Sequence, residues 1–208
     1  DLVCLGRLDE ADAVIDALVS IAAADGTPVT QAAAEHGETT RAAMRGDAAA
    51  QVQHAIRALD LVERLGLRSS IALSAIFLGS ARCNEENWSA AIPVLERAYA
   101  LHQERLFRIG EVLTLAYLAQ ARLGAGDAAG ARAAADEALT LAAQRGLWFG
   151  AVEAWVARAR ARLHEGGTAL VSAIEQDLAA ADALVTRTGE RMAAPLILLA
   201  RAELAERL

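Results

Sequence analysis

Lysine is absent from the 208-residue sequence, in which all 20 basic residues are arginine. This absence excludes a lysine Schiff base, a lysine general base and the lysine of a Walker-type phosphate loop. We interpret the bias as the mark of a GC-rich coding background, because the codons of arginine and alanine are rich in G and C.

Aromatic residues, which favour strands, make up only 4% of the chain. Alanine, the strongest helix former, supplies about a quarter of it, and hydrophobic residues together supply 55%. This hydrophobic content excludes a disordered chain. The composition therefore predicts an all-α fold.

Cysteine is limited to Cys4 and Cys83, which form no C-x-x-C motif. Two isolated cysteines are too few for a disulfide framework, so we expect a reducing, cytoplasmic setting. No apolar run approaches the roughly 20 residues that span a bilayer, and the first residues lack the basic-then-apolar pattern of a signal peptide. We therefore expect no membrane partner.

Positive charge is too sparse for nucleic-acid binding. The formal net charge is −7, whereas contacts between basic side chains and phosphates supply most of the affinity for DNA or RNA. The densest basic run spaces Arg158, Arg160 and Arg162 two residues apart, so on a helix they point in different directions. We expect these side chains to be solvated and the segment to bind no nucleic acid directly.

Small residues recur at an interval of 40 residues, in three separate series. The first series is Gly6, Gly46, Gly126 and Gly166, with Glu86 in the remaining slot. The second is Gly26, Gly66 and Gly146, and the third is Ala58, Ala98 and Ala138. Three independent series with one period indicate a repeat protein.

Each repeat contains a first and a second helix. Between residues 112 and 123 the apolar side chains follow the i, i+3, i+4, i+7 spacing of an amphipathic helix, whereas a strand would alternate. The turn that follows is spelled GAGD, and its Asp127 is placed to cap the second helix. We expect that helix to end at Gly146, because glycine adopts the left-handed conformation that closes a helix without steric cost.

This template predicts about ten antiparallel helices. A second-type helix opens the chain at 9–24 and a first-type helix closes it at 191–207, with four pairs between them at 28–45 and 48–65, 68–84 and 87–105, 108–124 and 127–145, and 148–164 and 168–187. We interpret residues 1–208 as a single repeat array, with half-repeats at 1–26 and 190–208 and repeats at 27–66, 67–106, 107–146 and 147–189. Because the final helix is apolar on one side, we expect the array to be a segment of a longer protein.

The helix expected at 28–45 is the weakest. Its apolar stripe consists of Val29, alanines and Met44, and Gly37 in its middle costs about 1 kcal/mol relative to alanine. It either packs through close contact of small residues or is the most mobile element, and we favour mobility.

The turn at 124–129 also matches the dinucleotide-binding fingerprint G-x-G-x-x-G/A, through Gly124, Gly126 and Ala129. That fingerprint requires a strand before the first glycine and a helix after the last. Here a helix is expected before it, and Gly126 belongs to a repeating series. We therefore interpret the turn as the hinge of a helical hairpin and expect no cofactor.

The residue pattern resembles the tetratricopeptide repeat (TPR), which reads W-x-x-L-G-x-x-Y, then A-x-x-x-F, then a closing proline. One first helix places Ala75, Leu78, Gly79 and Arg82 at these positions, and a later one places Trp155 at the tryptophan. The resemblance implies a right-handed α-α superhelix, a TPR-like solenoid. It covers nearly the whole chain.

The sequence also departs from the TPR pattern. Its period is 40 residues rather than 34, the closing proline is absent, and the tyrosine position holds Arg82, Arg122 and Arg162. We interpret this arginine as a cation at the negative end of each first helix, with a ligand-binding ladder as the alternative. Longer units of this kind resemble the C-terminal helical regions of bacterial multidomain signalling proteins, namely LuxR-type ATP-dependent activators and class III adenylate cyclases.

No group of residues has the spacing of a catalytic or metal site. No i, i+4 pair occurs among the four histidines, which are His36, His54, His102 and His164. An aromatic cage could be built from the three tryptophans, although packing is the preferred interpretation for Trp88, Trp148 and Trp155. We therefore expect no enzyme activity and no metal in this chain.

The TPR resemblance implies that first-type helices line a concave groove that binds a protein or peptide partner. The family's groove positions correspond here to Phe77, Ser80, Asn84, Tyr117, Gln120 and Arg160. The clamp that binds peptide carboxylates in some relatives needs basic residues and asparagine where this chain has Ile76 and Ala116.

These observations lead to two hypotheses of function. The first is a protein-interaction scaffold, the sensor arm of a larger bacterial signal-transduction or transcription-regulatory protein. The alternative is a domain that binds a small effector and is attached to an ATPase or nucleotide cyclase.

Overall fold

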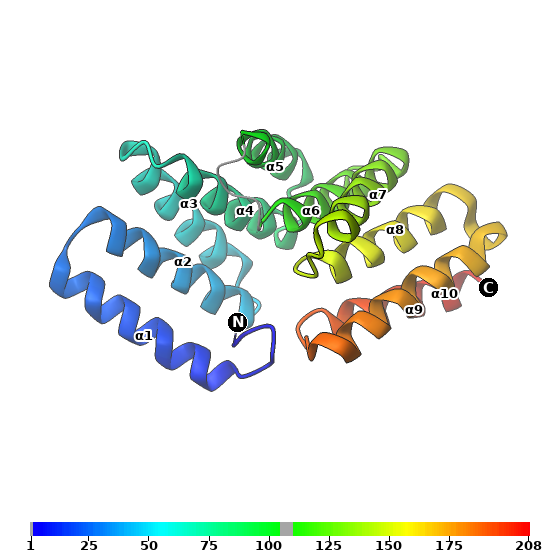
Figure 1. Ribbon diagram of the computed structural model, residues 1–208, viewed down its shortest axis with the longest axis horizontal. Coiled ribbons are helices and arrows are strands. Elements are labelled where there is room, and N and C mark those ends of the chain that lie inside the picture. Colours follow the sequence, from blue (N-terminus) through cyan, green and yellow to red (C-terminus); the bar gives the residue numbers. More distant parts are fainter. Residues whose placement is uncertain (1, 105–109) are drawn as a thin grey trace. The chain divides into compact units, whose positions relative to one another are not determined.

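The structure is a computed structural model that describes residues 2–104 and 110–208 (Figure 1). Regular structure in these residues consists of ten α-helices and one short 3₁₀ helix, without a strand. The predicted all-α class is confirmed. The helix ends predicted at residues 105 and 108, and the repeat boundary between residues 106 and 107, lie outside the described residues.

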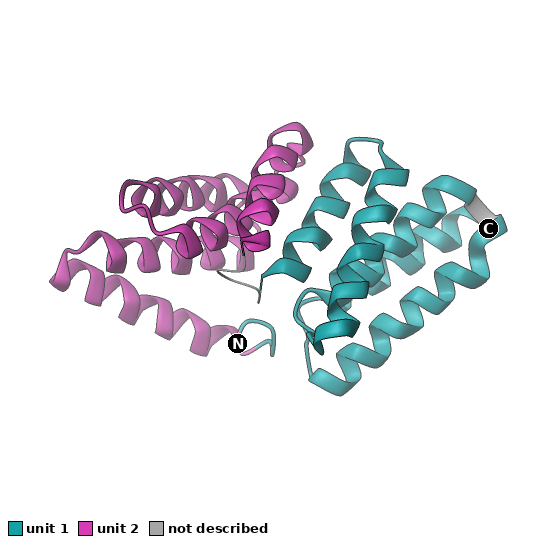
Figure 2. Ribbon diagram, turned by 45° about the horizontal axis from the view of Figure 1, so that its top comes forward, with its two compact units in different colours: residues 1, 3–6, 109–208 teal, residues 2, 7–108 magenta. Residues whose placement is uncertain are grey.

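The helices are divided between two compact units (Figure 2). The N-terminal unit, Arg7–Arg108 with Leu2, contains α1 (Leu8–Asp25), α2 (Pro28–Met44), α3 (Ala48–Arg64), α4 (Arg68–Asn84) and α5 (Trp88–Gln103). The C-terminal unit, Ile109–Leu208 with Val3–Gly6, contains α6 (Glu111–Gly124), α7 (Ala128–Arg145), α8 (Ala151–Gly166), η1 (Gly167–Leu170), α9 (Val171–Thr188) and α10 (Ala194–Arg207).

First-type helices form the inner side of each unit. These are α2, α4, α6, α8 and α10, and each packs against its neighbours in sequence within its unit. In addition, α2 contacts α4, α6 contacts α8 and α8 contacts α10, whereas the described residues show no comparable contact between α1 and α3, α3 and α5, or α7 and α9. Because helices on the inside of a curve lie closer to their second neighbours, the first-type helices make the concave side.

Small residues let the two helices of each hairpin approach closely. Ala58, Ala98 and Ala138, predicted from their spacing, are all 0% exposed. A further series at the same interval lies on the first-type helices, namely Thr39, Gly79, Ala119 and Ala159. These two series face the interior of the hairpins, so large side chains are confined to the spaces beside them.

Helix α2, expected to be weak, is helical over Pro28–Met44 and packs through small residues. Gly37 lies so close to α1 that a Cβ there would be 3.1 Å from Cγ2 of Ile15. Ala32 and Ala42 on the same helix are also buried. Close contact of small residues, the first of the two alternatives, therefore describes this helix.

The turns inside the hairpins carry the predicted 40-residue series. Gly46 and Gly126 have φ of 70° and 87°, and Glu86, which fills the remaining slot, has φ of 57°. Left-handed backbone therefore occurs at this position in the three hairpins α2–α3, α4–α5 and α6–α7, and the two glycines supply it without steric cost.

The turn at 124–129 is a hinge between helices. Helix α6 precedes it, α7 follows it, and Asp127 Oδ1 accepts a hydrogen bond from the Gly130 backbone N–H at 2.8 Å. The predicted cap is confirmed, and the strand that a dinucleotide-binding fingerprint needs is replaced by a helix.

The interval lengthens to 43 residues in the last repeat. Helix α8 continues through Gly166, so this member of the predicted series lies in a helix and not in a turn. The short helix η1 follows, and α9 ends at Gly189, which is left-handed with φ of 75° like Gly146 at the end of α7. The predicted starts of α8, α9 and α10, at 148, 168 and 191, are each three residues too early.

Replacing Gly79 tests the close contact in hairpin α4–α5. A Cβ at Gly79 would lie 2.3 Å from Cδ2 of Leu95, which is 0% exposed. We predict that Gly79→Ala lowers the free energy of unfolding by roughly 1 to 3 kcal/mol, because overpacking outweighs the gain in helix propensity. Urea denaturation followed by circular dichroism measures the change. In a Leu95→Ala background the substitution should cost little, and an equal cost there would contradict this explanation.

Glu86 supplies a test of the turn. Because a side chain in the left-handed region is strained, Glu86→Gly should raise the free energy of unfolding by about 1 kcal/mol in the same measurement. Glu86→Ala removes the charge and keeps the Cβ, so it should give no such gain. Equal stabilisation by alanine would show that charge, and not backbone conformation, is responsible.

Candidate functional site

The inner face of the N-terminal unit contains a histidine between α2 and α4. His36 Nε2 lies 2.7 Å from Ser74 Oγ, and its ring stacks on Phe77 with centroids 4.9 Å apart. Burial lowers the pKa of His36 to about 4, so the ring is neutral at pH 7. Ser74 is 0% exposed. The pair therefore joins two helices and does not offer a nucleophile to a substrate.

Three predicted groove residues lie on α4, and one of them, Phe77, is half-buried beside this histidine. Ser80 is buried, and its hydroxyl donates to the Phe77 carbonyl at 2.9 Å. Asn84 donates through its side-chain amide to Gln51 Oε1 on α3, also at 2.9 Å. Ser80 is therefore enclosed in the helix packing, whereas Asn84 is exposed and is bonded to the neighbouring helix.

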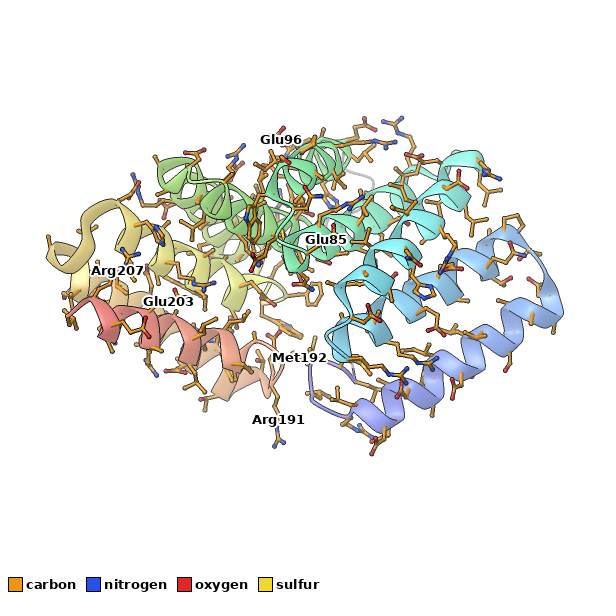
Figure 3. All side chains as sticks on the ribbon, turned by 180° about the vertical axis from the view of Figure 1, so that it is seen from behind. Glu85, Glu96, Arg191, Met192, Glu203 and Arg207 are labelled. Carbon is orange, nitrogen blue, oxygen red and sulfur yellow. The ribbon has the colours of Figure 1, made fainter. Side chains whose placement is uncertain are left out.

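The other three predicted groove residues lie in the C-terminal unit. Tyr117 and Gln120 are half-buried on α6. Arg160 on α8 forms an ion pair with Glu203 on α10, with 2.8 Å between Nε and Oε2, and Glu203 is labelled in Figure 3. This pair links two first-type helices, as the histidine does in the N-terminal unit. The six predicted residues are therefore divided equally between the two units.

The expectation that Arg158, Arg160 and Arg162 are solvated is wrong. Their side chains are only 16%, 25% and 23% exposed. Arg158 and Arg162 share the buried carboxylate of Asp177 on α9, each with an N–O distance of 2.7 Å. Arg158 and Arg162, four residues apart, lie on the same face of α8 and both reach α9, whereas Arg160 reaches α10. Because α9 and α10 both pack against α8, neither direction leads to solvent.

The arginines at the TPR tyrosine position bond within their own hairpins. Arg82 pairs with Glu85 in the turn at 2.7 Å. Arg122 and Arg162 donate to carbonyls of the following second-type helices, at 3.4 Å to Gly130 and 3.0 Å to Ala173. These contacts favour a structural role over a ligand-binding ladder.

Comparisons with known proteins identify the architecture. No family model matches the chain, and no curated protein matches it in sequence. Among solved structures, the crystal structure of a Podospora anserina protein, described as a kinesin light chain with nearly identical TPR-like repeats, superposes with a TM-score of 0.58. The match covers 83% of each chain at 20% sequence identity. The fold is TPR-like.

At this level of identity the likeness shows the fold alone. It confirms the resemblance to tetratricopeptide repeats. The resemblance of the TPR-like chain to LuxR-type activators and adenylate cyclases stays a prediction.

The described part of the TPR-like array offers no metal site, since no three His, Cys, Asp or Glu residues there are grouped to hold an ion. Within residues 2–104 and 110–208, every helix is too short or too polar to cross a bilayer.

A buried pair of carboxyl groups in the C-terminal unit was missed by sequence reasoning. The Oε2 atoms of Glu153 on α8 and Glu190 before α10 are both buried, with no hydrogen-bond partner within the described chain. Burial, reinforced by the charge of Glu190, raises the pKa of Glu153 to about 7. The pKa of the nearby Cys4 thiol is raised by burial and by both carboxyls, so Cys4 is no reactive thiolate. Nothing local in the sequence marks these residues.

The raised pKa of Glu153 makes stability depend on pH. Its ordinary value is 4.5, so between pH 4.5 and about 7 the folded state holds a proton that the unfolded state has lost. The free energy of unfolding should therefore fall as pH rises through this window. Glu153→Gln cannot ionise, and we predict that it raises this free energy by roughly 1 to 3 kcal/mol at pH 8.

Urea denaturation at pH 5 and pH 8 measures this effect. Glu175→Gln, on the exposed surface of α9, is the control for loss of one carboxylate and should leave the pH dependence unchanged. An unaltered pH dependence in Glu153→Gln would refute the assignment.

Proposed function

We propose that the TPR-like array is a non-enzymatic module that binds a protein or peptide partner on the inner face formed by its first-type helices. The main support is the contact between successive first-type helices within each unit, which gives each unit a concave side. Phe77 and Tyr117 are partly buried on these helices. Aromatic side chains held in this way commonly anchor protein interfaces.

The charge on this face favours a particular kind of partner. Arg160 is neutralised by Glu203, and His36 is uncharged because burial lowers its pKa. The inner face therefore has little free positive charge to attract an acidic peptide. It suits a segment that presents apolar and amide groups.

The wider proposal is that the chain is the regulatory or sensor arm of a larger cytoplasmic bacterial protein, in signal transduction or transcription regulation. Any catalytic or DNA-binding part would lie in other domains. Exposed apolar residues on α10, with Leu198 at 66% and Leu199 at 50%, support packing of a further helix there. The coding sequence on either side tests this, since flanking ATPase, cyclase or DNA-binding sequence is expected and immediate start and stop codons would contradict it.

The alternative function, a small-effector sensor attached to an ATPase or nucleotide cyclase, is favoured by a different observation. The C-terminal unit contains a cleft of small-molecule size on its second-type helices. That cleft lies between α7 and α9, away from the inner face.

Peptides selected from a random library against the whole chain test the inner face. We predict that replacing Tyr117 and Gln120 together by alanine weakens the binding of the selected peptides at least tenfold, because interface anchors contribute about 2 kcal/mol or more. Fluorescence anisotropy of labelled peptides measures this affinity. Both side chains are half-buried on α6. The proposal places them on the concave side of the C-terminal unit.

The matched control replaces Thr140 and Gln144, two exposed residues of the second-type helix α7, by alanine. This pair should leave binding unchanged. If it abolished binding while the α6 pair retained it, the partner surface would be on the second-type helices and the proposal would be wrong. Circular dichroism of both variants checks that the fold is intact.

A further inference from the structure

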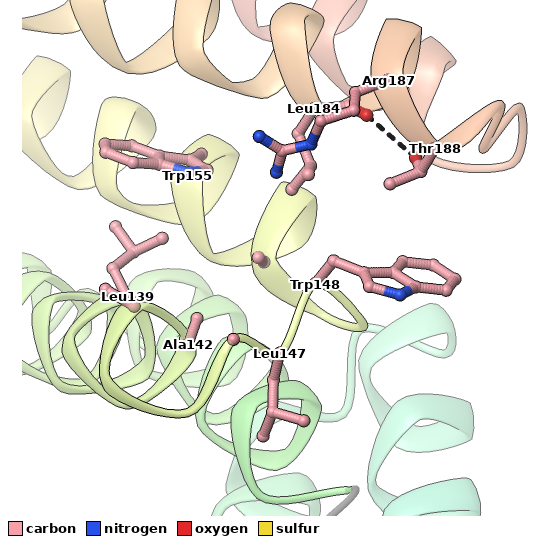
Figure 4. Close-up of a pocket in the computed structure, with 11 residues that line it drawn as sticks. Leu139, Ala142, Leu147, Trp148, Trp155, Leu184, Arg187 and Thr188 are labelled. Carbon is pink, nitrogen blue, oxygen red and sulfur yellow. Dashed lines mark hydrogen bonds between the residues drawn. The ribbon is translucent and has the colours of Figure 1, made fainter.

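The C-terminal unit contains a cleft of about 450 Å³ between α7, α8 and α9 (Figure 4). This is the volume of a typical small-molecule site. Leu139 from α7 and Leu184 from α9 line opposite sides, and Trp148 and Trp155 supply two indole rings. The cleft involves the second-type helices and the start of α8, so it is separate from the inner face. An inference about its ligand deepens the alternative function, the small-effector sensor, and does not depend on partner binding at the inner face.

The two tryptophans are held differently. Trp155 on α8 has the guanidinium of Arg158 4.4 Å from its ring centroid, and Arg158 is itself fixed by Asp177. One face of this indole is thereby covered, and its position is set. Trp148 in the loop before α8 is 43% exposed and packs edge-on against Phe149. Together with Leu139, Leu147 and Leu184, the two indoles give the cleft the largely apolar lining that is typical of small-molecule sites.

The polar groups at the cleft differ in whether their hydrogen-bond donors are already used within the protein. The Thr188 hydroxyl already donates to the Leu184 carbonyl at 2.9 Å, as the dashed line in Figure 4 shows. Arg187 is exposed and, within the described residues, has neither an ion pair nor a hydrogen bond from its side chain. Its guanidinium extends from α9 toward Trp155 in Figure 4. The described residues that line the cleft include no carboxylate.

An unpaired guanidinium beside apolar walls favours one class of ligand. A guanidinium binds a carboxylate through two parallel N–H donors, and its attraction is stronger beside apolar walls than in open solvent. The leucines and indoles exclude water from an apolar or aromatic body. The geometry points to a site for a small apolar carboxylate, with its body between the tryptophans and leucines and its carboxylate on Arg187.

Tryptophan fluorescence tests the site with defined probes. In a Trp88→Phe background, the two remaining tryptophans both line the cleft, so their emission reports on it. We expect 4-phenylbutyrate to quench this emission saturably and to bind about tenfold more tightly than the neutral 4-phenylbutanamide at 150 mM salt. Arg187→Gln should remove this tenfold difference, because it should weaken the binding of 4-phenylbutyrate and leave that of the amide unchanged.

Two further variants make the result decisive. Arg64→Gln removes a charge from the N-terminal unit, where that side chain is 73% exposed, and should leave both affinities unchanged. Ala143→Leu adds bulk at the cleft and should weaken the binding of both probes. Equal binding of the acid and the amide, absence of saturable quenching, or an equal loss in Arg64→Gln would overturn the assignment.

Discussion

Close contact between small residues of paired helices is the constraint on which the rest of the structure depends. Ala58, Ala98 and Ala138 have no exposed surface, and each lies opposite a first-type helix that also presents a small residue. Helices that approach this closely accept a large side chain only where the facing position is small, as where Leu95 on α5 lies against Gly79 on α4. The repeat interval therefore fixes both where the helices meet and where bulky residues such as Leu95 can be placed.

Helix α8 shows how this packing determines electrostatics. It contacts α6, α7, α9 and α10, so the charged side chains it carries are partly enclosed. A buried charge is costly unless it is paired, and Arg158, Arg160 and Arg162 are accordingly paired with carboxylates on other helices. Glu153 on the same helix meets another carboxyl instead of a cation, and its raised pKa is the result.

Periodicity predicted the helices and turns well because both depend on residues near in sequence. Asp127 capping Gly130 and the left-handed backbone at Glu86 follow from local geometry. Burial of charged side chains could not be predicted, since the pairing of Arg160 with Glu203 spans 43 residues and two helices. Gly166 matched the interval by position, yet a three-residue lengthening of the repeat moved the turn beyond it. Of the six groove residues, the structure shows Ser80 buried and Asn84 bonded to Gln51 on α3, details that spacing does not encode.

The cleft between α7 and α9 arises from a difference between repeats that are otherwise equivalent. Counting back by 43 and then repeatedly by 40 residues, the counterparts of Arg187 are Gln144 on α7, Glu104 after α5 and Arg64 on α3. Gln144 carries no charge, and Glu104 forms an ion pair with Arg68. The guanidinium of Arg64 is paired with Asp60. Among the second-type helices that the structure describes, only α9 therefore places an unpaired guanidinium beside an exposed indole. In a repeat protein the fold is set by what the repeats share, whereas a specific site requires a combination of residues that one repeat has and the others lack.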